Sequence, residues 1–133
     1  MSRTHWLKRQ DGQAAAEMAL VLPVLAALLL GIAQFGIVFN NYITLTDATR
    51  AGARKAAVSR FVGDGGKSAK ATVYSSASNL DSNALEVTVD ASPNWTAPGG
   101  DVTVTATYPY SIDILGWTVA GGKLTSKTTE RLE

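Results

Sequence analysis

The chain has no cysteine and a single histidine among its 133 residues. Without cysteine there can be no disulfide scaffold, no thiolate metal site and no thiol nucleophile. Its 12 basic residues nearly balance its 11 acidic ones, giving a formal charge of +1. Nucleic-acid-binding proteins usually show a clear excess of basic residues, so this balance argues against a nucleic-acid partner.

Residues suited to catalysis are also scarce. The histidine, His5, lies in the short basic N-terminal segment. The acidic residues of the second half have neither calcium-loop spacing nor a companion base: Asp81, Glu86, Asp90, Asp101 and Asp113. Gly66-Lys67-Ser68 imitates the end of a phosphate-binding loop, but the earlier glycine is out of register and no strand precedes it. We expect no catalytic residue, no metal ligand and no cofactor.

One long apolar run dominates the first third of the chain. From Ala14 to Phe39 the one ionisable residue is Glu17, and beyond it Gln34 is the polar exception. At a helical rise of 1.5 Å per residue the run is about 39 Å long, enough to cross a hydrocarbon core of about 30 Å. It exceeds the apolar core of a signal peptide, about 7 to 15 residues, and no small-x-small cleavage site ends it. We expect a transmembrane helix over residues 13–39.

The charges beside this run predict its orientation. Three firmly basic residues precede it: Arg3, Lys8 and Arg9. Basic residues close to a membrane helix favour the cytoplasmic side, so the N-terminus should be cytoplasmic and the C-terminal domain extracytoplasmic. The opposite flank carries basic residues too, which weakens this argument, although they lie on a continuing helix: Arg50, Arg54 and Lys55.

Glu17 is the residue in the run that most needs an explanation. Insertion scales assign a charged side chain at the centre of a membrane helix a cost of about 2.5 to 3.5 kcal/mol, so such residues usually serve a function and have a partner. The alternative is that Glu17 reaches the membrane surface or favours the positive end of the helix dipole.

The spacing around Glu17 has a known counterpart. Type IV prepilin peptidases cut after a glycine that follows a basic leader, leaving a new N-terminal residue four before a glutamate; Gly12, Gln13 and Glu17 have this spacing. Residues 12–58 resemble the TadE-like family of the tight-adherence (Flp) pilus system in four segments: Gly12-Gln13-Ala14-Ala15-Ala16-Glu17, Ala19-Leu20-Val21-Leu22-Pro23, Leu30-Gly31-Ile32-Ala33-Gln34-Phe35-Gly36 and Ala48-Thr49-Arg50-Ala51-Gly52-Ala53-Arg54. A weaker resemblance ends at Glu130-Arg131-Leu132-Glu133.

This resemblance implies a function in pilus assembly. The leader, residues 1–12, would be removed between Gly12 and Gln13, and Glu17 would pair with the N-terminal amine of a neighbouring subunit. Met18 stands where short Flp-type pilins place an aromatic residue, so the resemblance implies a minor pilin or pseudopilin. The implied partners are other pilins or pseudopilins, the prepilin peptidase, the assembly platform in the inner membrane and the lipid bilayer. The alternatives are an uncleaved single-pass membrane protein with a small extracytoplasmic interaction domain and, with less support, an exported enzyme.

Small residues predict where the helix packs. Ala27 and Gly31 form a small-xxx-small element, with Gly36 beyond it, and such elements let membrane helices approach closely. Pro23 either kinks the helix or is tolerated within it. Helical periodicity continues over residues 40–62, with a narrow face through Gly52 that should pack on a sheet. The glycines of residues 63–66 should end the helix.

Residues 63–133 are expected to form a small extracytoplasmic α+β domain. A short helix is predicted at about 68–80, and alternating apolar residues predict an antiparallel pair of strands near 85–90 and 102–108. A third strand, 123–132, should follow a turn at Gly121-Gly122. An apolar cluster either covers the sheet, the commoner arrangement, or lies against the membrane surface: Ile112, Ile114, Leu115 and Trp117. The fold class is therefore α+β and pilin-like, a long N-terminal helix whose first half is transmembrane, packed on three or four antiparallel strands.

Overall fold

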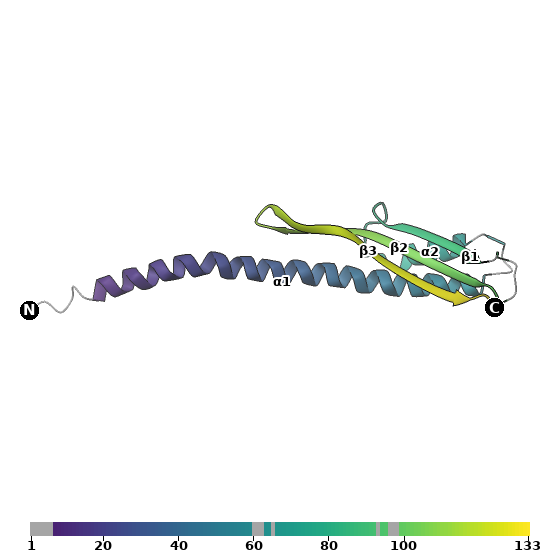
Figure 1. Cartoon of the computed structure of the whole chain (residues 1–133), viewed down its shortest axis with the longest axis horizontal. Coiled ribbons are helices and arrows are strands. Elements are labelled where there is room, and N and C mark those ends of the chain that lie inside the picture. Colours follow the sequence, from purple (N-terminus) through teal and green to yellow (C-terminus); the bar gives the residue numbers. More distant parts are fainter. Residues whose placement is uncertain (1–6, 60–62, 65, 93, 96–98) are drawn as a thin grey trace, which may run out of the picture.

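The computed structural model describes residues 7–59, 63–64, 66–92, 94–95 and 99–133, with side chains from Gly12 onward. The described chain contains two helices and three strands in the order α1 (Leu7–Ala57), α2 (Lys67–Ser76), β1 (Glu86–Ser92), β2 (Asp101–Ile114) and β3 (Trp117–Arg131). α1 runs the length of the molecule, and the sheet and α2 gather along its C-terminal half (Figure 1). We call this C-terminal half of α1, with α2 and the sheet, the head. The predicted α+β class and the three-stranded antiparallel sheet are confirmed.

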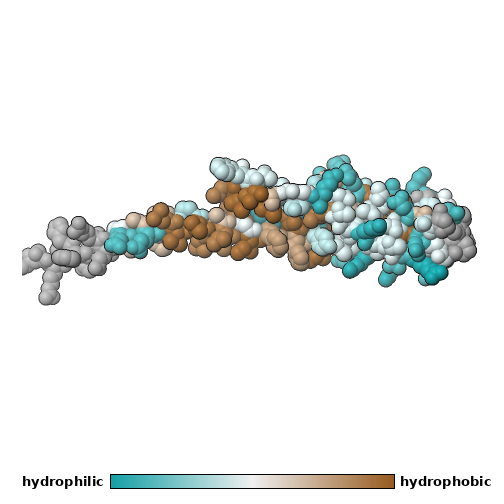
Figure 2. Space-filling view, viewed as in Figure 1, coloured by the Kyte–Doolittle hydropathy of each residue, from teal (hydrophilic) through white to brown (hydrophobic). Residues whose placement is uncertain are grey.

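α1 has 51 residues, which makes it about 77 Å long at the usual helical rise. The helix continues through Pro23 without interruption. Large apolar side chains stand exposed all along its first half, which forms a brown column in Figure 2. Among the described residues, α1 is the helix whose length and composition would allow it to cross a membrane.

The C-terminal end of α1 differs from the prediction. The helix ends at Ala57 instead of continuing to residue 62. Just beyond the end, the Ser59 backbone N–H donates to the Ala56 carbonyl, three residues back, at 3.0 Å, and its hydroxyl donates to the Lys55 carbonyl at 2.6 Å. A bond to the third residue back is the tighter pattern common at helix ends.

The sheet is an antiparallel meander in the order β1-β2-β3. Val87 is opposite Ala106 and Val89 is opposite Val104, so the apolar residues of the two predicted strands share one face. That face packs on α1, while the other carries threonines and charged side chains. The alternation in the sequence therefore identified the buried face of β1 and β2.

The turn between β2 and β3 is not where we predicted it. Gly121 and Gly122 lie inside β3, opposite Ser111 and Tyr110, so the predicted turn there is wrong. A Cβ atom at Gly122 would lie 3.3 Å from Cε1 of Tyr110, and one at Gly121 3.3 Å from the Tyr110 carbonyl oxygen. The two glycines let β2 and the Tyr110 ring approach β3 closely, a known use of glycine inside strands.

The actual turn consists of Leu115 and Gly116. Ile114 pairs with Trp117 across it, and the φ angles of Leu115 and Gly116 are 52° and 83°. Two central residues with positive φ are the mark of a type I′ turn. The predicted apolar cluster thus forms the end of a long β2–β3 hairpin. It does not cover the sheet, because the tip extends past β1 and α2 and lies along the middle of α1 (Figure 1).

The core of the head forms where α1, α2 and the sheet meet. Fully buried aliphatic side chains come from all three: Leu45, Ala48, Ala53 and Ala56 of α1, Ala69 and Val73 of α2, and Val102, Val104 and Ala106 of β2. Gly52 occupies the closest approach. A Cβ atom there would overlap Cγ2 of Val73 and lie 3.6 Å from Cγ1 of Val104. The small face of α1 therefore packs on α2 as well as on the predicted sheet.

Candidate functional site

The proposed cleavage point lies near the start of α1. Gly12 is exposed, and among the described residues no heavy atom other than the local helix backbone lies within 4 Å of where its Cβ would be. Arg3 and His5 of the leader lie outside the described residues. The Gly12–Gln13 peptide is thus part of the helix and its surroundings are open.

Glu17 lies one helical turn after Gln13 on the exposed surface of α1. The amide Nε2 of Gln13 donates to Oε1 of Glu17 at 3.1 Å. Within the described residues the ion pairs are Arg50 with Asp47 at 3.8 Å and Lys123 with Glu86 at 3.3 Å, and both are remote from this end of α1. The described part of the chain therefore gives the Glu17 carboxylate a neutral hydrogen-bond partner.

The residues predicted to mediate helix packing fall into three environments. Gly52 lies in the core of the head, as described above. Ala27 and Gly31 are half-buried, and Cδ1 of Ile114 lies 3.7 Å from the position of a Cβ on Gly31. Gly36 is exposed, with nothing within 4 Å of its Cβ position. Gly31 thus receives the hairpin of its own chain, while the surface at Gly36 is open.

Gln34, the polar exception in the apolar run after Glu17, contacts the β2–β3 hairpin. Its Nε2 donates to the Asp113 carbonyl oxygen near the tip of the β2–β3 hairpin, at 3.3 Å. Half-buried residues recur every three or four positions on this face of α1: Ala27, Gly31, Gln34, Val38 and Asn41. The hairpin therefore follows one face of α1 into the apolar run. A lone polar residue in that run was the signal available in the sequence.

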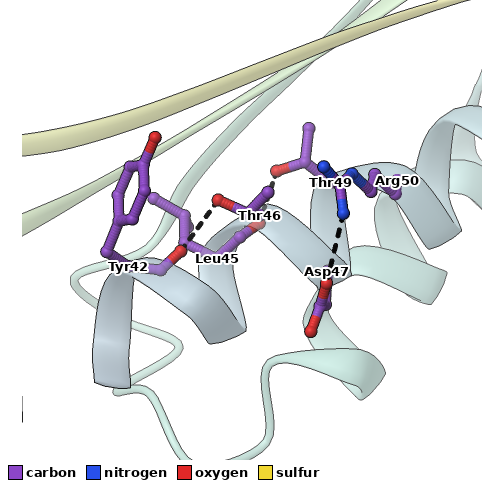
Figure 3. A network of polar contacts seen from close by, with 6 residues as sticks. All are labelled: Tyr42, Leu45, Thr46, Asp47, Thr49 and Arg50. Carbon is purple, nitrogen blue, oxygen red and sulfur yellow. Dashed lines mark hydrogen bonds and ion pairs between the residues drawn. The ribbon is translucent and has the colours of Figure 1, made fainter. Parts of the chain in front are cut away.

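After the apolar run, threonine side chains of α1 donate hydrogen bonds to backbone carbonyls of the same helix. Thr46 donates to the Tyr42 carbonyl at 2.9 Å and Thr49 to the Leu45 carbonyl at 2.6 Å (Figure 3). Arg50 pairs with Asp47 on the outside of the helix, as their spacing predicts. With Arg54 and Lys55, Arg50 lines a shallow hollow whose other wall includes Thr128 and Glu130.

The segment Gly66-Lys67-Ser68, which imitates the end of a phosphate-binding loop, lies at the start of α2. The Asp64 carboxylate accepts hydrogen bonds from the backbone N–H groups of Gly66 at 2.9 Å and Ser68 at 3.0 Å. Hydrogen bonds from the Ser68 side chain and backbone lower the pKa of Asp64. The chain's own carboxylate therefore occupies the place where a helix N-terminus would hold a phosphate.

The acidic residues singled out in the sequence do not gather. Across the part of the chain that is described, no three acidic or histidine side chains lie close enough to hold a metal ion. Glu86 is engaged by Lys123, and Asp113 accepts hydroxyl hydrogen bonds from Ser111 and Thr118. These carboxylates have structural roles in β1 and the hairpin.

The features that gather in the structure belong to α1: an open glycine, a carboxylate with a neutral partner, and an apolar surface. The model of the TadE-like protein family matches residues 12–54. This segment begins at Gly12 and ends in the part of α1 that belongs to the core. No curated protein and no solved structure matches the chain. Residues 12–54 therefore match the TadE-like family, as the resemblance seen in the sequence predicted, and this match points to a membrane protein related to the tight-adherence pilus.

Proposed function

We propose that the protein is a minor pilin or pseudopilin that joins the assembly of a tight-adherence (Flp-type) type IV pilus after prepilin peptidase cuts between Gly12 and Gln13. The observation that carries this proposal is Glu17, an exposed carboxylate on an apolar helix, five residues after Gly12. A simple anchor gains nothing from such a residue, because the charge raises the cost of insertion. Subunit pairing gives it a use.

Cleavage would create the missing partner. Removing residues 1–12 leaves an α-amino group on Gln13 whose ordinary pKa is about 8, so it is largely protonated at neutral pH. Glu17 already accepts the Gln13 amide within its own chain, but a carboxylate can accept about four hydrogen bonds. It can therefore also bind the amine of a neighbouring subunit shifted along the helix axis. Pairing offsets part of the desolvation that each charge would suffer alone.

The rest of α1 offers a surface for neighbours. Gly36 is open, while Gly31 is half-covered by the hairpin, so a second helix can approach closely at Gly36. The partners we propose are other pilins or pseudopilins, the prepilin peptidase and the assembly platform in the inner membrane. Residues 13–39 would lie in the cytoplasmic membrane, with the N-terminus cytoplasmic and the head extracytoplasmic, contributing contacts and no catalysis.

Processing is tested by intact mass of the membrane fraction from a host with its own prepilin peptidase. The wild-type chain should lack residues 1–12, and Gly12→Val should retain them, because a branched side chain blocks the peptide bond that glycine leaves open. A retained leader in the wild type, or a cut near residue 40, would support the uncleaved anchor or a secretory signal instead.

Pairing is tested separately with Glu17→Ala and Glu17→Gln. Both should insert and be processed, because the span becomes less polar, yet crosslinking to neighbouring pilins and pilus assembly should fall. Glu17→Gln keeps a side chain that can bond to Gln13, so an equal loss in both variants assigns the effect to the charge. Glu17→Asp is the matched control and should retain part of the function. Normal assembly by Glu17→Ala would make the carboxylate a bystander.

A further inference from the structure

The tip of the β2–β3 hairpin exposes an unusual amount of apolar surface. Leu115 is 72% exposed, Trp117 82% and Val119 66%, and with Ile114 they line one apolar hollow. Figure 2 shows this patch as brown atoms beside the brown column of α1. Large contiguous apolar patches on a protein surface usually mark a contact with another molecule or with a membrane.

The contacts of the tip show which part of α1 it lies beside. Ile114 packs at Gly31, and the Asp113 carbonyl accepts the Gln34 amide. Both α1 residues belong to the apolar run, and the hairpin tip extends from Gln34 toward the N-terminal end of α1 (Figure 1). A bilayer that surrounds α1 at this level must therefore also surround the tip.

The chemistry of the turn points the same way. Two-residue type I′ turns strongly favour Asn-Gly or Asp-Gly, because both central residues need positive φ. Here Leu115 takes the first position with a φ of 52°, a backbone conformation that bulky residues rarely adopt. A turn that faces water has little use for leucine at this cost. Ile114 and Trp117 pair across the turn, and a register shift leaves Val119 without a partner on β2. Within residues 114–119, Leu115, Gly116 and Val119 therefore lie outside the ladder, which limits the backbone polar groups brought toward lipid.

Polar groups gather at the base of the tip. Oγ1 of Thr118 donates to Oδ1 of Asp113 at 2.6 Å and Oγ of Ser111 donates to Oδ2 at 3.0 Å. They lie at the level of Gln34, which bonds the same residue. The hairpin therefore places its polar groups beside Gln34, the polar exception of the apolar run after Glu17. Trp117 lies between these groups and the turn, and tryptophan is enriched at membrane surfaces.

We propose that the hairpin tip, residues 114–119, enters the bilayer beside α1, in the leaflet on the side of the head, as a second membrane contact. The Gln34–Asp113 hydrogen bond and Val119, which follows the Asp113–Thr118 pair, then lie at the headgroup edge of the hydrocarbon, and the turn lies deeper. Counting down α1 from Gln34, a hydrocarbon core of about 30 Å requires about 20 residues and ends near Gln13. This inference rests on α1 crossing a membrane, which the proposed function also requires, and not on cleavage or pilus assembly.

Because the chain lacks cysteine, single probes can be attached without further changes. Val119→Cys reports the tip, Val24→Cys the membrane part of α1 and Thr129→Cys the exposed far end of β3. The full chain, labelled with an environment-sensitive fluorophore, is reconstituted into phosphatidylethanolamine–phosphatidylglycerol vesicles. Nitroxide lipids labelled near the headgroup should quench the Val119 probe and deeper nitroxides the Val24 probe. Aqueous iodide should quench the Thr129 probe alone.

The outcomes separate this inference from the proposed function. A Val119 probe quenched by iodide and not by nitroxide, with Val24 still in lipid, overturns the tip contact alone. A Val24 probe quenched by iodide means that α1 does not cross the bilayer and overturns both. A Val119 probe shielded from both quenchers, with Val119→Cys chains crosslinking to each other, assigns the tip to a second copy and overturns the lipid contact.

A second variant tests whether the apolar side chains drive insertion. Leu115→Asn supplies the residue that this turn prefers, and Trp117→Thr keeps a good strand former, so the double variant should retain the hairpin. In it, the Val119 probe should lose most of its nitroxide quenching and become accessible to iodide, while the Val24 and Thr129 probes stay unchanged. Unaltered nitroxide quenching at Val119 would show that Leu115 and Trp117 do not hold the tip in lipid and would overturn the proposal.

Discussion

Gly52 shows how one missing side chain joins three elements. The hydrogen on its Cα faces Val73 of α2, the Ala69 carbonyl and Val104 of β2, at distances that leave no room for a methyl group. The same residue type at Gly36 faces open space. Two glycines in one helix therefore have opposite surroundings, and substitution can distinguish them.

We predict that Gly52→Ala lowers the melting temperature of the full chain in detergent, because overpacking a close contact typically costs about 1 to 3 kcal/mol. Gly52→Leu should lower it further. Gly36→Ala is the matched control, since both changes add the same methyl to a helix; without a clash it should be neutral or stabilising by up to about 1 kcal/mol. Thermal unfolding followed by circular dichroism is the measurement. Equal effects at the two glycines would mean that the core joint is not at Gly52.

Asp64 predicts a dependence on pH. Its hydrogen bonds at the start of α2 hold the pKa of this carboxyl below the ordinary aspartate value, which is about 4. A depressed folded-state pKa means that the stabilisation is complete above the ordinary value and is lost as the pH falls through the folded value. Asp64→Asn should melt lower at neutral pH and lose less stability than the wild type on acidification below about pH 4. Parallel acid titrations of the two chains would contradict this.

At the scale of elements, the sequence predicted what depends on local periodicity and missed what depends on distant partners. The alternation from Leu85 onward predicted the strands and their buried face. The hairpin turn was missed because Gly121-Gly122 is a stronger local turn signal than Leu115-Gly116. The role of Gly121 and Gly122 depends on Tyr110, which lies on the neighbouring strand β2. The end of α1 was missed because the helix ends at Ala57, before the glycines that gave the local stop signal.

The residues of the candidate site also divide into those that local spacing predicted and those that depend on distant partners. Gly12, Gln13 and Glu17 could be picked out from the sequence because their relation is a short spacing along one helix. Gln34 could be noticed but not understood, because its partner, Asp113, lies 79 positions further along the chain. No local pattern of residues encodes such a contact. The hairpin carries the apolar cluster away from the sheet and beside the apolar part of α1, so the commoner arrangement, in which the cluster covers the sheet, is wrong.

We predict that Gln34→Leu loosens the hairpin without affecting membrane insertion. The change makes the span more apolar and removes the hydrogen bond to the Asp113 carbonyl, worth about 0.5 to 1.5 kcal/mol. Amide hydrogen exchange in residues 110–120 should accelerate, while exchange in β1 should not. Thr46→Val is the control, because it removes a side-chain bond within α1 alone. Unchanged exchange in the hairpin would show that Gln34 does not hold it.

At the scale of the whole molecule, one helix joins Glu17 to the core of the head without a hinge. An inserted residue between them turns Glu17 about 100° around the helix axis relative to the head, whereas four inserted residues turn it about 40°. If assembly depends on direction, one alanine inserted after Ala26 should impair crosslinking to neighbouring pilins more than four alanines do, with processing normal in both. A loss that simply grows with inserted length would show that the distance matters and the direction does not.

The unbroken α1 has a consequence for any filament built from this chain. Glu17 and Gly52 are 35 positions apart, which puts them roughly a quarter turn from each other around the axis and about 52 Å apart along it. If the Glu17 charge pair fixes the rotation of α1 about its axis in the bundle, it therefore also fixes the direction in which every head points. Each subunit would present the same threonine-rich face of its sheet outward, so the character of the outer surface is decided in the membrane, before a head meets its neighbours.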